Sequence, residues 1–388
     1  MTAGCDDGTA DPVDLAQRLI RCRSVTPADD GALAVLVEAL TALGFRCERV
    51  TFSEAGTPDI DNLYARWGHG ERNICFAGHT DVVPAGDPAD WTVDPFAGAI
   101  VGDELIGRGV VDMKGAIAAF VAAAAQALKG RDPARHSVSL LITGDEEGPS
   151  INGTRKLLDW LAEKGECLDA CIVGEPTSGA VLGDTVKVGR RGSLNATLTA
   201  VGHQGHTAYP QHAENPIHPL VRALQRMVDT PLDAGSAHFE PSRLQVTSID
   251  VGNPATNVIP ARAVAKVNLR FNDRHTGADI VNWMEAHIRE VEGDIALSTR
   301  ISGESFLSPA GPLRDAVADA VAGTLGWTPA LGTGGGTSDA RFITKVCPVV
   351  ELGLKNATAH QVDESAPLAD LRQLSEVYRV ALNRFLEP

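Results

Sequence analysis

Three short apolar segments constrain the fold of this chain more than any other feature. They occupy residues 72–78, 137–144 and 169–174, and each runs into a polar or glycine-rich loop. Helical periodicity alternates with them and also occupies residues 12–22 and 31–45. Strands that are apolar throughout are typical of parallel sheets covered on both faces. The pattern predicts an α/β fold with a largely parallel sheet, in which ligands bind beyond the carboxyl ends of the strands.

A second pattern begins near residue 192. Residues 192–304 read as strand, helix, strand, strand, helix and strand, the βαββαβ order of a ferredoxin-like unit. Long helices then resume around an apolar strand at residues 347–353. We therefore expect a discontinuous catalytic domain of residues 1–191 and 305–388, with residues 192–304 as an inserted domain.

The composition narrows the possible partners. A net charge of −16 argues against nucleic acid or an anionic membrane as a partner. No apolar run is expected to approach the ~18–20 residues that cross a bilayer, and residues 116–130 are expected to form a packed helix. The first twelve residues lack the basic and apolar regions of a secretory signal, and seven scattered cysteines fit reduced thiols. A cytoplasmic protein is expected.

Acidic and imidazole side chains gather where the apolar strands end and in two further loops. Three strands that end alike in such groups predict a shared site at the carboxyl edge of the sheet. The residues are His79 and Asp81 after the first strand, Glu146 and Glu147 after the second, Glu175 after the third, and Asp112 and His360 in loops.

Two imidazoles and at least three carboxylates make a mixed nitrogen and oxygen donor set that suits Zn²⁺ or a similar ion. Five ligands are too many for one open zinc site, so the set predicts two metal ions about 3.5–4 Å apart, bridged by Asp112. Asp81, two residues beyond His79, can reach the other ring nitrogen on an extended backbone. One of Glu146 and Glu147 can ligate while the other serves as general base, and the sequence leaves their order open. The plain alternative is a His and an Asp that merely end a strand.

A glycine-rich run at residues 332–342 lacks the βαβ surroundings of a dinucleotide-binding loop. It predicts instead a cradle of backbone N–H groups near Ser338 that could hold a carboxylate.

Motifs along nearly the whole chain resemble those of the co-catalytic metallopeptidase family that includes acetylornithine deacetylase and carboxypeptidase G. In chain order they are GHTDVVP, GRGVVDMKG, GDEEG, GEPTS, VGRRGS, GHQGHTAYP, AENPIHP, NVIP, GGGTSDARF and NATAHQVDE.

The resemblance implies two Zn²⁺ ions per subunit, with Co²⁺ as a substitute. It assigns His79 and Glu175 to one metal, Glu147 and His360 to the other, Asp112 as the bridge, Glu146 as general base and Asp81 as the residue that orients His79.

The resemblance also implies a homodimer, formed through the inserted domain, which serves as a lid and contributes His206 to the partner's site. The substrate contacts that it implies are Arg190, Tyr209, Asn257, Arg270 and Thr337.

The activity implied is hydrolysis of an amide in a small anionic substrate. The arginines favour a substrate with an added carboxylate, N-succinyl-LL-2,6-diaminopimelate, whose cleavage belongs to the synthesis of lysine and peptidoglycan precursors. The alternatives are an acetylornithine deacetylase-like or other N-acyl amino acid deacylase or dipeptidase. A non-catalytic metal-binding protein is a remote alternative, since it would not need Glu146 beside Glu147.

Overall fold

The computed structural model describes residues 11–387 and divides into two compact units. The large unit comprises the described parts of Met1–Val188, Ser308–Gly332 and Ser338–Pro388, and the small unit comprises Gly189–Leu307 and Thr333–Thr337. Hydrogen bonds explain why the short second segment belongs to the small unit. Arg190 Nη1 donates to the carbonyl of Gly336 (2.9 Å), and the Thr333 hydroxyl donates to the carbonyl of His238 (2.6 Å).

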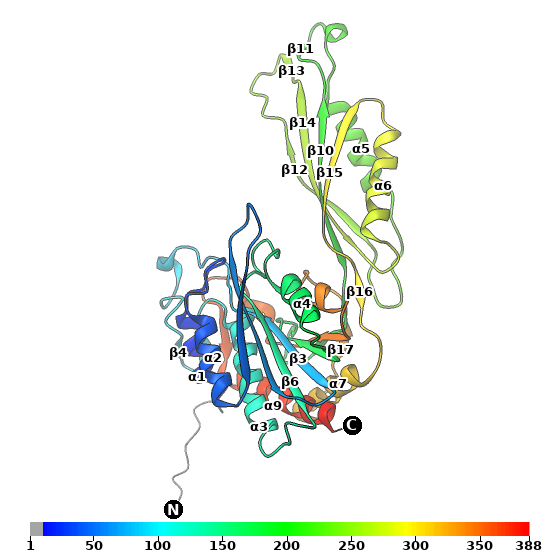
Figure 1. Cartoon of the computed structure of the whole chain (residues 1–388). Helices are drawn as coiled ribbons and strands as arrows, with labels where there is room; N and C mark the ends of the chain where they lie inside the picture. Colours follow the sequence, from blue (N-terminus) through cyan, green and yellow to red (C-terminus); the bar gives the residue numbers. More distant parts are fainter. Residues whose placement is uncertain (1–10, 388) are drawn as a thin grey trace, which may run out of the picture. The chain divides into compact units, whose positions relative to one another are not determined.

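The large unit is built on an eight-stranded sheet (Figure 1). Its strand order is β1 (Arg46–Phe52), β2 (Ile60–Gly68), β6 (Ser137–Thr143), β3 (Asn73–His79), β7 (Ala170–Val173), β18 (Val349–Glu351), β8 (Thr185–Lys187) and β17 (Ala330–Gly332). The four strands from β6 to β18 are parallel, whereas β1 and β2 add an antiparallel edge that was not predicted. Every residue of β3, β6 and β7 is buried, which confirms the expected α/β fold with a parallel centre.

Helices cover this sheet. One group of helices packs together: α1 (Pro12–Arg21), α3 (Gly115–Ala127), α7 (Pro312–Leu325) and α9 (Leu368–Leu386). The remaining helices pack near the sheet: α2 (Ala32–Ala42) against β1 and β2, and α4 (Thr154–Glu163) against α8 (Ala340–Ile343) and β6.

Helix α3 and the turn before it depart from one expectation. The 18 residues Val110–Ala127 have a mean hydropathy of 1.4, so by length and composition they could cross a membrane. The expectation that no such run exists is therefore wrong. However, 83% of this segment is buried inside the protein, and the Phe120 ring stacks on Phe76 with centroids 4.3 Å apart. The segment is thus packed as a core helix, as predicted.

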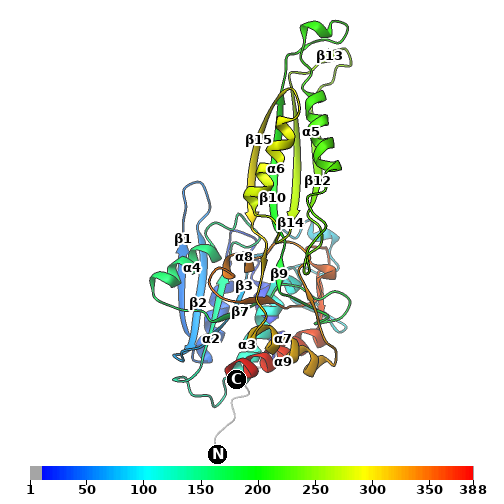
Figure 2. The ribbon, with the colours of Figure 1, turned by 90° about the vertical axis from the view of Figure 1, so that its right-hand side faces the viewer.

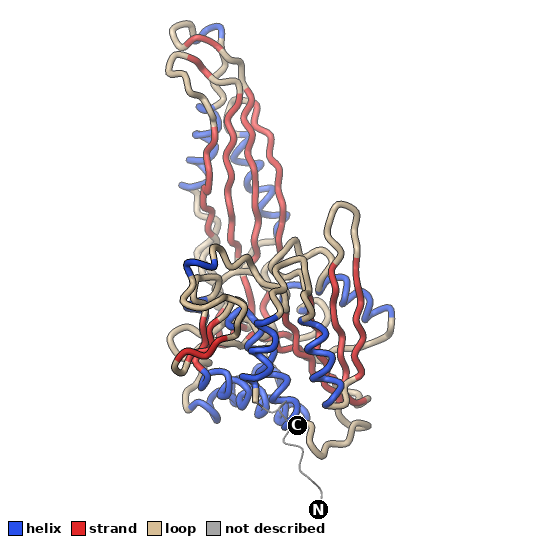
Figure 3. The backbone as a smooth tube through the Cα atoms, turned by 90° about the vertical axis from the view of Figure 1, so that its left-hand side faces the viewer, coloured by secondary structure: helices blue, strands red, loops and turns tan. Residues whose placement is uncertain are grey.

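The small unit has the predicted βαββαβ order. Its antiparallel sheet runs β12 (Arg243–Asp250), β14 (Arg262–Phe271), β10 (Gly192–Val201) and β15 (Asp294–Gly303), with helices α5 (Ile217–Asp229) and α6 (Gly277–Arg289). Figure 2 shows the two helices beside this sheet, and Figure 3 shows its long strands side by side. Leu198, Leu269 and Met284 are fully buried in the core between the sheet and the helices.

Two shorter features of the fold matter for the site. In the large unit, β4 (Ala99–Val101), β5 (Glu104–Ile106) and β19 (Ser365–Pro367) form a small antiparallel sheet. In the small unit, β11 (Gly205–His206) pairs with β13 (Val258–Ile259).

Candidate metal centre

Two histidine rings face the two oxygens of a single carboxylate. His79 Nε2 lies 3.2 Å from Asp112 Oδ1, and His360 Nε2 lies 3.3 Å from Asp112 Oδ2. Glu175 Oε1 is 3.6 Å from His79 Nε2, and Glu147 Oε1 is 2.7 Å from His360 Nε2. The five predicted ligands are therefore brought together in two sets that share Asp112.

The parallel strands explain this convergence. His79 is the last residue of β3, and Glu175 follows the end of β7 by two residues. Glu147 lies in the turn after β6, so all three side chains leave the same edge of the sheet. Asp112 lies in the turn Val110–Lys114 before α3, where its own backbone is not helical (φ −123°, ψ 91°), and its peptide bond to Met113 is cis.

The donor set fits divalent metal ions. The nearest donor atoms of His79, Asp112 and Glu147 lie within 4.8 Å of one another, as do those of His79, Glu146 and Glu175. Imidazole nitrogens and carboxylate oxygens are ligands for zinc and similar ions, and a carboxylate with both oxygens directed at different ligand sets can bridge two of them. The His79 Nδ1 lies 2.9 Å from the main-chain carbonyl of Asp81. Because a carbonyl only accepts, Nδ1 donates, and Nε2 of the neutral ring is left free to ligate.

The carboxylate of Asp81 has a different partner from the one expected. It is fully buried, and it accepts hydrogen bonds from the backbone N–H groups of Glu146 (3.2 Å) and Glu147 (3.0 Å). Its nearer oxygen is 3.6 Å from His79 Nδ1, farther than the main-chain carbonyl of the same residue. Burial raises the pKa of Asp81 to about 6, against the opposing effect of the His79 ring. Asp81 thus holds the turn that carries both glutamates.

The charges of the site depend on one another. Burial lowers the pKa of His79, but the carboxylates of Asp112 and Glu175 outweigh it and raise that pKa well above the ordinary value. Hydrogen bonds with Asp112 and Glu147 raise the pKa of His360 to about 10. Burial raises the pKa of Asp112, yet the two imidazoles prevail and lower it. The carboxylates therefore need a positive partner, which a bound cation supplies.

Glu146 and Glu147 lie in a turn and not on an extended backbone. Their side chains nevertheless join different donor sets: Glu147 contacts His360, while Glu146 groups with His79 and Glu175. Burial, reinforced by the negative charge of Glu175, raises the pKa of Glu146 well above its ordinary value. A carboxylate with a raised pKa is suited to accept a proton near neutral pH.

Sequence reasoning missed Glu364 and Arg108. The Glu364 side chain is fully buried, and Arg108 Nη1 donates to it at 2.7 Å. Glu364 stands at the end of the motif that supplied His360, and that proximity was the only signal of it in the sequence.

The predicted catalytic residue His206 and two predicted substrate contacts, Tyr209 and Asn257, lie close together in the small unit. His206 lies in β11, opposite Val258 of β13, and its ring centroid is 5.6 Å from that of Tyr209. The carbonyl of Asn257 accepts from the backbone of Thr207 (3.1 Å). The His206 Nδ1 accepts from the N–H of Ala208 (3.0 Å), so the proton of the neutral ring is on Nε2.

The other predicted substrate residues lie elsewhere in the same unit. Arg190 is buried and bonds to Gly336, next to the half-buried Thr337. Arg270 Nε donates to Asn268 (3.2 Å), while its Nη1 is buried and has no hydrogen-bond partner among the described residues. Burial and the neighbouring Arg191 lower the pKa of Arg270.

The side chain of Ser338, where a carboxylate cradle of backbone N–H groups was predicted, binds a carboxylate of the protein itself. The Ser338 hydroxyl donates to Glu351 Oε1 at 2.6 Å, and both side chains are buried. The helix that follows, α8, is only four residues long.

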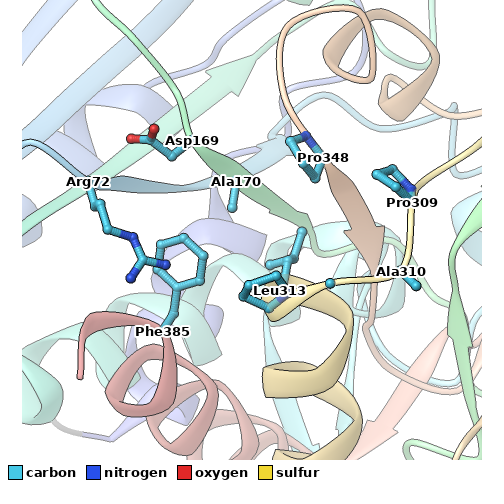
Figure 4. A pocket seen from close by; sticks show the side chains of 10 residues that line it. Arg72, Asp169, Ala170, Pro309, Ala310, Leu313, Pro348 and Phe385 are labelled. Carbon is cyan, nitrogen blue, oxygen red and sulfur yellow. The ribbon is translucent and has the colours of Figure 1, made fainter. Parts of the chain in front are cut away.

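A cavity of about 230 Å³ lies at the other end of the central strands (Figure 4). It is lined by Asp169 and Ala170 at the start of β7, by Pro348 before β18, and by Phe385. The guanidinium of Arg72 lies over the Phe385 ring, 4.5 Å from its centroid. None of the predicted ligands lines this cavity.

A family model and proteins of related sequence match most of the chain. Residues 75–384 match the model of the peptidase family M20/M25/M40. A protein of Rhodospirillum centenum named succinyl-diaminopimelate desuccinylase is 58% identical over 379 residues, which cover 97% of each chain. A protein of Parvibaculum lavamentivorans with the same name is 54% identical and covers 97% of this chain and 95% of its own.

Solved structures share the fold at low sequence identity. An aminopeptidase from Bacillus cereus superposes with a TM-score of 0.78 at 19% identity, covering 98% of this chain and 99% of the other. A dinuclear metal binding peptidase of the M20 family from Bacillus subtilis superposes with a TM-score of 0.70 at 14% identity, covering 96% and 97%.

Proposed function

The chain belongs to the peptidase family M20/M25/M40, and on that premise we propose that it hydrolyses N-succinyl-LL-2,6-diaminopimelate to succinate and LL-2,6-diaminopimelate. This reaction serves the synthesis of lysine and peptidoglycan precursors. Relatives with more than half of their residues identical over nearly the full length carry the name of this activity.

The observation that carries the catalytic part of the proposal is the position of Asp112 between two histidines. In this proposal His79 and Glu175 would hold one Zn²⁺ and Glu147 and His360 the other, while Asp112, which contacts both histidines, would serve both sets. Such a pair of ions, or Co²⁺ in their place, would polarise the amide carbonyl and lower the pKa of a water molecule.

The residues around the scissile amide have separate roles in this proposal. Glu146, with its raised pKa, accepts a proton from the attacking water and passes it to the leaving amine. Asp81 keeps Glu146 and Glu147 in place through their backbone amides. The Nε2–H of His206 donates to the oxyanion that develops on the carbonyl.

The geometry of the small unit supports a homodimer in which His206 acts on the partner's substrate. Arg270 pairs with Ser193 at one end of β10, whereas His206 follows the other end of that strand, beyond Val201. At ~3.3 Å per residue, the eight steps from Ser193 to Val201 span roughly 25 Å. A succinylated diamino acid is much shorter than that, so one small unit cannot place both residues on one substrate.

The preference for a succinyl group is assigned to the arginines. A net charge of −16 means that a polyanionic substrate needs local cations. Arg190 and Arg270 are such cations, and Nη1 of Arg270 has no hydrogen-bond partner among the described residues. Tyr209, Asn257 and Thr337 are proposed as further contacts.

The state of the cysteines supports a location for the protein. The described cysteines are free thiols, as expected for a reducing compartment, and we infer a cytoplasmic location.

The test is hydrolysis by the purified protein of N-succinyl-LL-2,6-diaminopimelate and N-acetylornithine, before and after chelation. Activity should disappear with the metal and return with Zn²⁺ or Co²⁺. Faster cleavage of N-acetylornithine would show that the protein is an acetylornithine deacetylase-like enzyme. Full activity without metal would contradict the two-metal mechanism.

The two glutamates provide a matched pair of variants. Glu146→Gln should retain both metals and lose about 10²–10⁴ in kcat, because the amide cannot accept the proton. Glu147→Gln should instead weaken metal binding, since Glu147 contacts His360 at 2.7 Å. The opposite result in metal analysis would exchange the two roles.

A further inference from the structure

We propose that Glu364 and Arg108 are positioning residues for the half of the metal centre that contains His360. This inference rests on the metal centre proposed above and adds two residues that do not contact the ions or the substrate. It starts from a fully buried carboxylate whose partners all belong to the segment that carries Asp112.

The Glu364 carboxylate binds the backbone of the Asp112 turn with both oxygens. Oε1 accepts from the N–H groups of Val111 (2.8 Å) and Asp112 (3.2 Å). Oε2 accepts from the N–H of Gly109 (3.1 Å) and from Arg108 Nη1 (2.7 Å). The N–H of Asp112 itself is therefore fixed, and with it the direction in which the shared carboxylate leaves the backbone.

We call these bonds of the Glu364 side chain with Arg108 and the Asp112 turn the clamp, and main-chain bonds add to it. The carbonyl of Glu364 accepts from the N–H of Gly107 (2.9 Å), and Ser365 pairs with Ile106 where β19 meets β5. The segment after His360 and the segment before Asp112 are thus joined along several consecutive residues.

Arg108 connects the same clamp to His360. Its Nη1 is bonded to Glu364, and its Nη2 lies 3.4 Å from the main-chain carbonyl of His360. The Arg108 side chain is 3% exposed, and its guanidinium lies over the Trp91 ring, 5.2 Å from the centroid. One guanidinium therefore fixes both the carboxylate that holds Asp112 and the backbone that carries His360.

The two halves of the metal centre depend on this clamp to different degrees. His79 is the last residue of the buried strand β3, and Glu175 lies two residues after the buried strand β7, so both stand at the ends of sheet strands. His360 lies in a loop with a left-handed backbone (φ 63°), and its side chain is 48% exposed. The Glu147 and His360 half should therefore be the more sensitive one, because its loop lacks the support of the sheet.

The test is a titration of metal-free protein with Co²⁺, followed by visible absorption and calorimetry. In Glu364→Gln, one oxygen becomes an NH₂ group that faces N–H donors, so the clamp opens on one side. We expect one of the two binding steps to weaken by about 10–100-fold, with a changed cobalt spectrum, and the other by less than about threefold.

Arg108→Lys keeps the charge but cannot reach Glu364 and His360 together, so it should weaken the same step. If Glu364→Gln does not fold, this variant decides the question. Asp233→Asn is the matched control, since the Asp233 side chain is 5% exposed and accepts from Gly235, Ser242 and Asn272 in the small unit. It should reduce stability and leave both binding steps unchanged.

The outcomes separate this inference from the function on which it rests. If the unaltered protein binds two Co²⁺ ions and both clamp variants bind them with unchanged affinity, the positioning role is wrong and the metal centre stands. If Asp233→Asn weakens the same step equally, the effect is general destabilisation and the positioning role is also wrong. If the unaltered protein binds no Co²⁺, the metal centre itself is wrong, and the inference fails with it.

Discussion

Replacing Asp81 by Asn tests whether this residue holds the glutamate turn or orients His79. The Asp81 carboxylate accepts from two backbone amides, those of Glu146 and Glu147, with one oxygen each. Asn keeps one acceptor and presents an NH₂ group to the other N–H. His79 should be little affected, since its Nδ1 donates to the main-chain carbonyl of residue 81, which the substitution retains.

The expected loss of stability follows from these contacts. Losing one hydrogen bond to a buried charged group costs about 1.5–3 kcal/mol. The new NH₂ group also faces a backbone N–H, and placing two donors against each other adds to that cost. Removing the charge of Asp81 relieves part of its desolvation penalty, which the raised pKa reveals. We therefore expect a net decrease of about 1–3 kcal/mol in the free energy of unfolding.

The assay is urea unfolding of the metal-free protein, because bound metal would add its own stabilisation. It is combined with kcat and metal analysis of the loaded protein. The turn carries both Glu146 and the proposed ligand Glu147, so kcat should fall by about 10–100-fold, and any loss of metal should accompany the loss of stability. Loss of metal at unchanged stability would refute this reasoning and return Asp81 to the role of orienting His79.

Asp145 offers a control in the same loop. Its Oδ2 accepts from both Ile151 (2.8 Å) and Asn152 (2.9 Å), while Oδ1 has no hydrogen-bond partner among the described residues. In Asp145→Asn the NH₂ group can take the place of the unpartnered oxygen. Stability should therefore fall by less than about 1 kcal/mol.

Three further predictions address the small unit. Mixing inactive His206→Ala chains with inactive Glu146→Gln chains should restore activity in mixed dimers, and no recovery in dimers shown to form would exclude action across the interface. Arg270→Ala should reduce the preference in kcat/KM for succinyl over acetyl substrates by about 10–100-fold without loss of zinc, and an unchanged preference would remove Arg270 from the substrate site. Burial raises the pKa of Asp233, but hydrogen bonds from Ser242 and other donors outweigh it and lower that pKa from 3.8 to about 2. Its contribution to stability, at most about 2 kcal/mol, should thus be present above about pH 4 and lost as the pH falls toward 2; a stability gap between wild type and Asp233→Asn that is independent of pH would contradict this.

Local patterns predicted much of the scaffold and the set of ligands. The uninterrupted apolar strands before His79, Glu146 and Glu175 predicted a parallel arrangement, and parallel strands bring their ends together without further information. The order of strands and helices likewise predicted the ferredoxin-like unit, because each element carries its own periodicity.

The residues that hold the ligands could not be predicted in the same way. Arg108 and Glu364 are 256 positions apart, and nothing in the surrounding sequence distinguishes a buried carboxylate from an exposed loop residue. The role of Asp81 depends on the turn after β6, which approaches it only through strand pairing. Such contacts depend on tertiary structure, which periodicity and motif spacing do not report.

The position of β18 in the sheet has a consequence for how the chain folds while it is being synthesised. This strand, Val349–Glu351, lies in the sheet between β7 and β8, which are encoded more than 160 residues earlier. On the ribosome, β7 must keep an open edge while the whole of Gly189–Leu307 is synthesised, and that intervening unit can fold first. An open strand edge is a site for aggregation, so the edge of β7 stays exposed to that hazard until β18 has been synthesised.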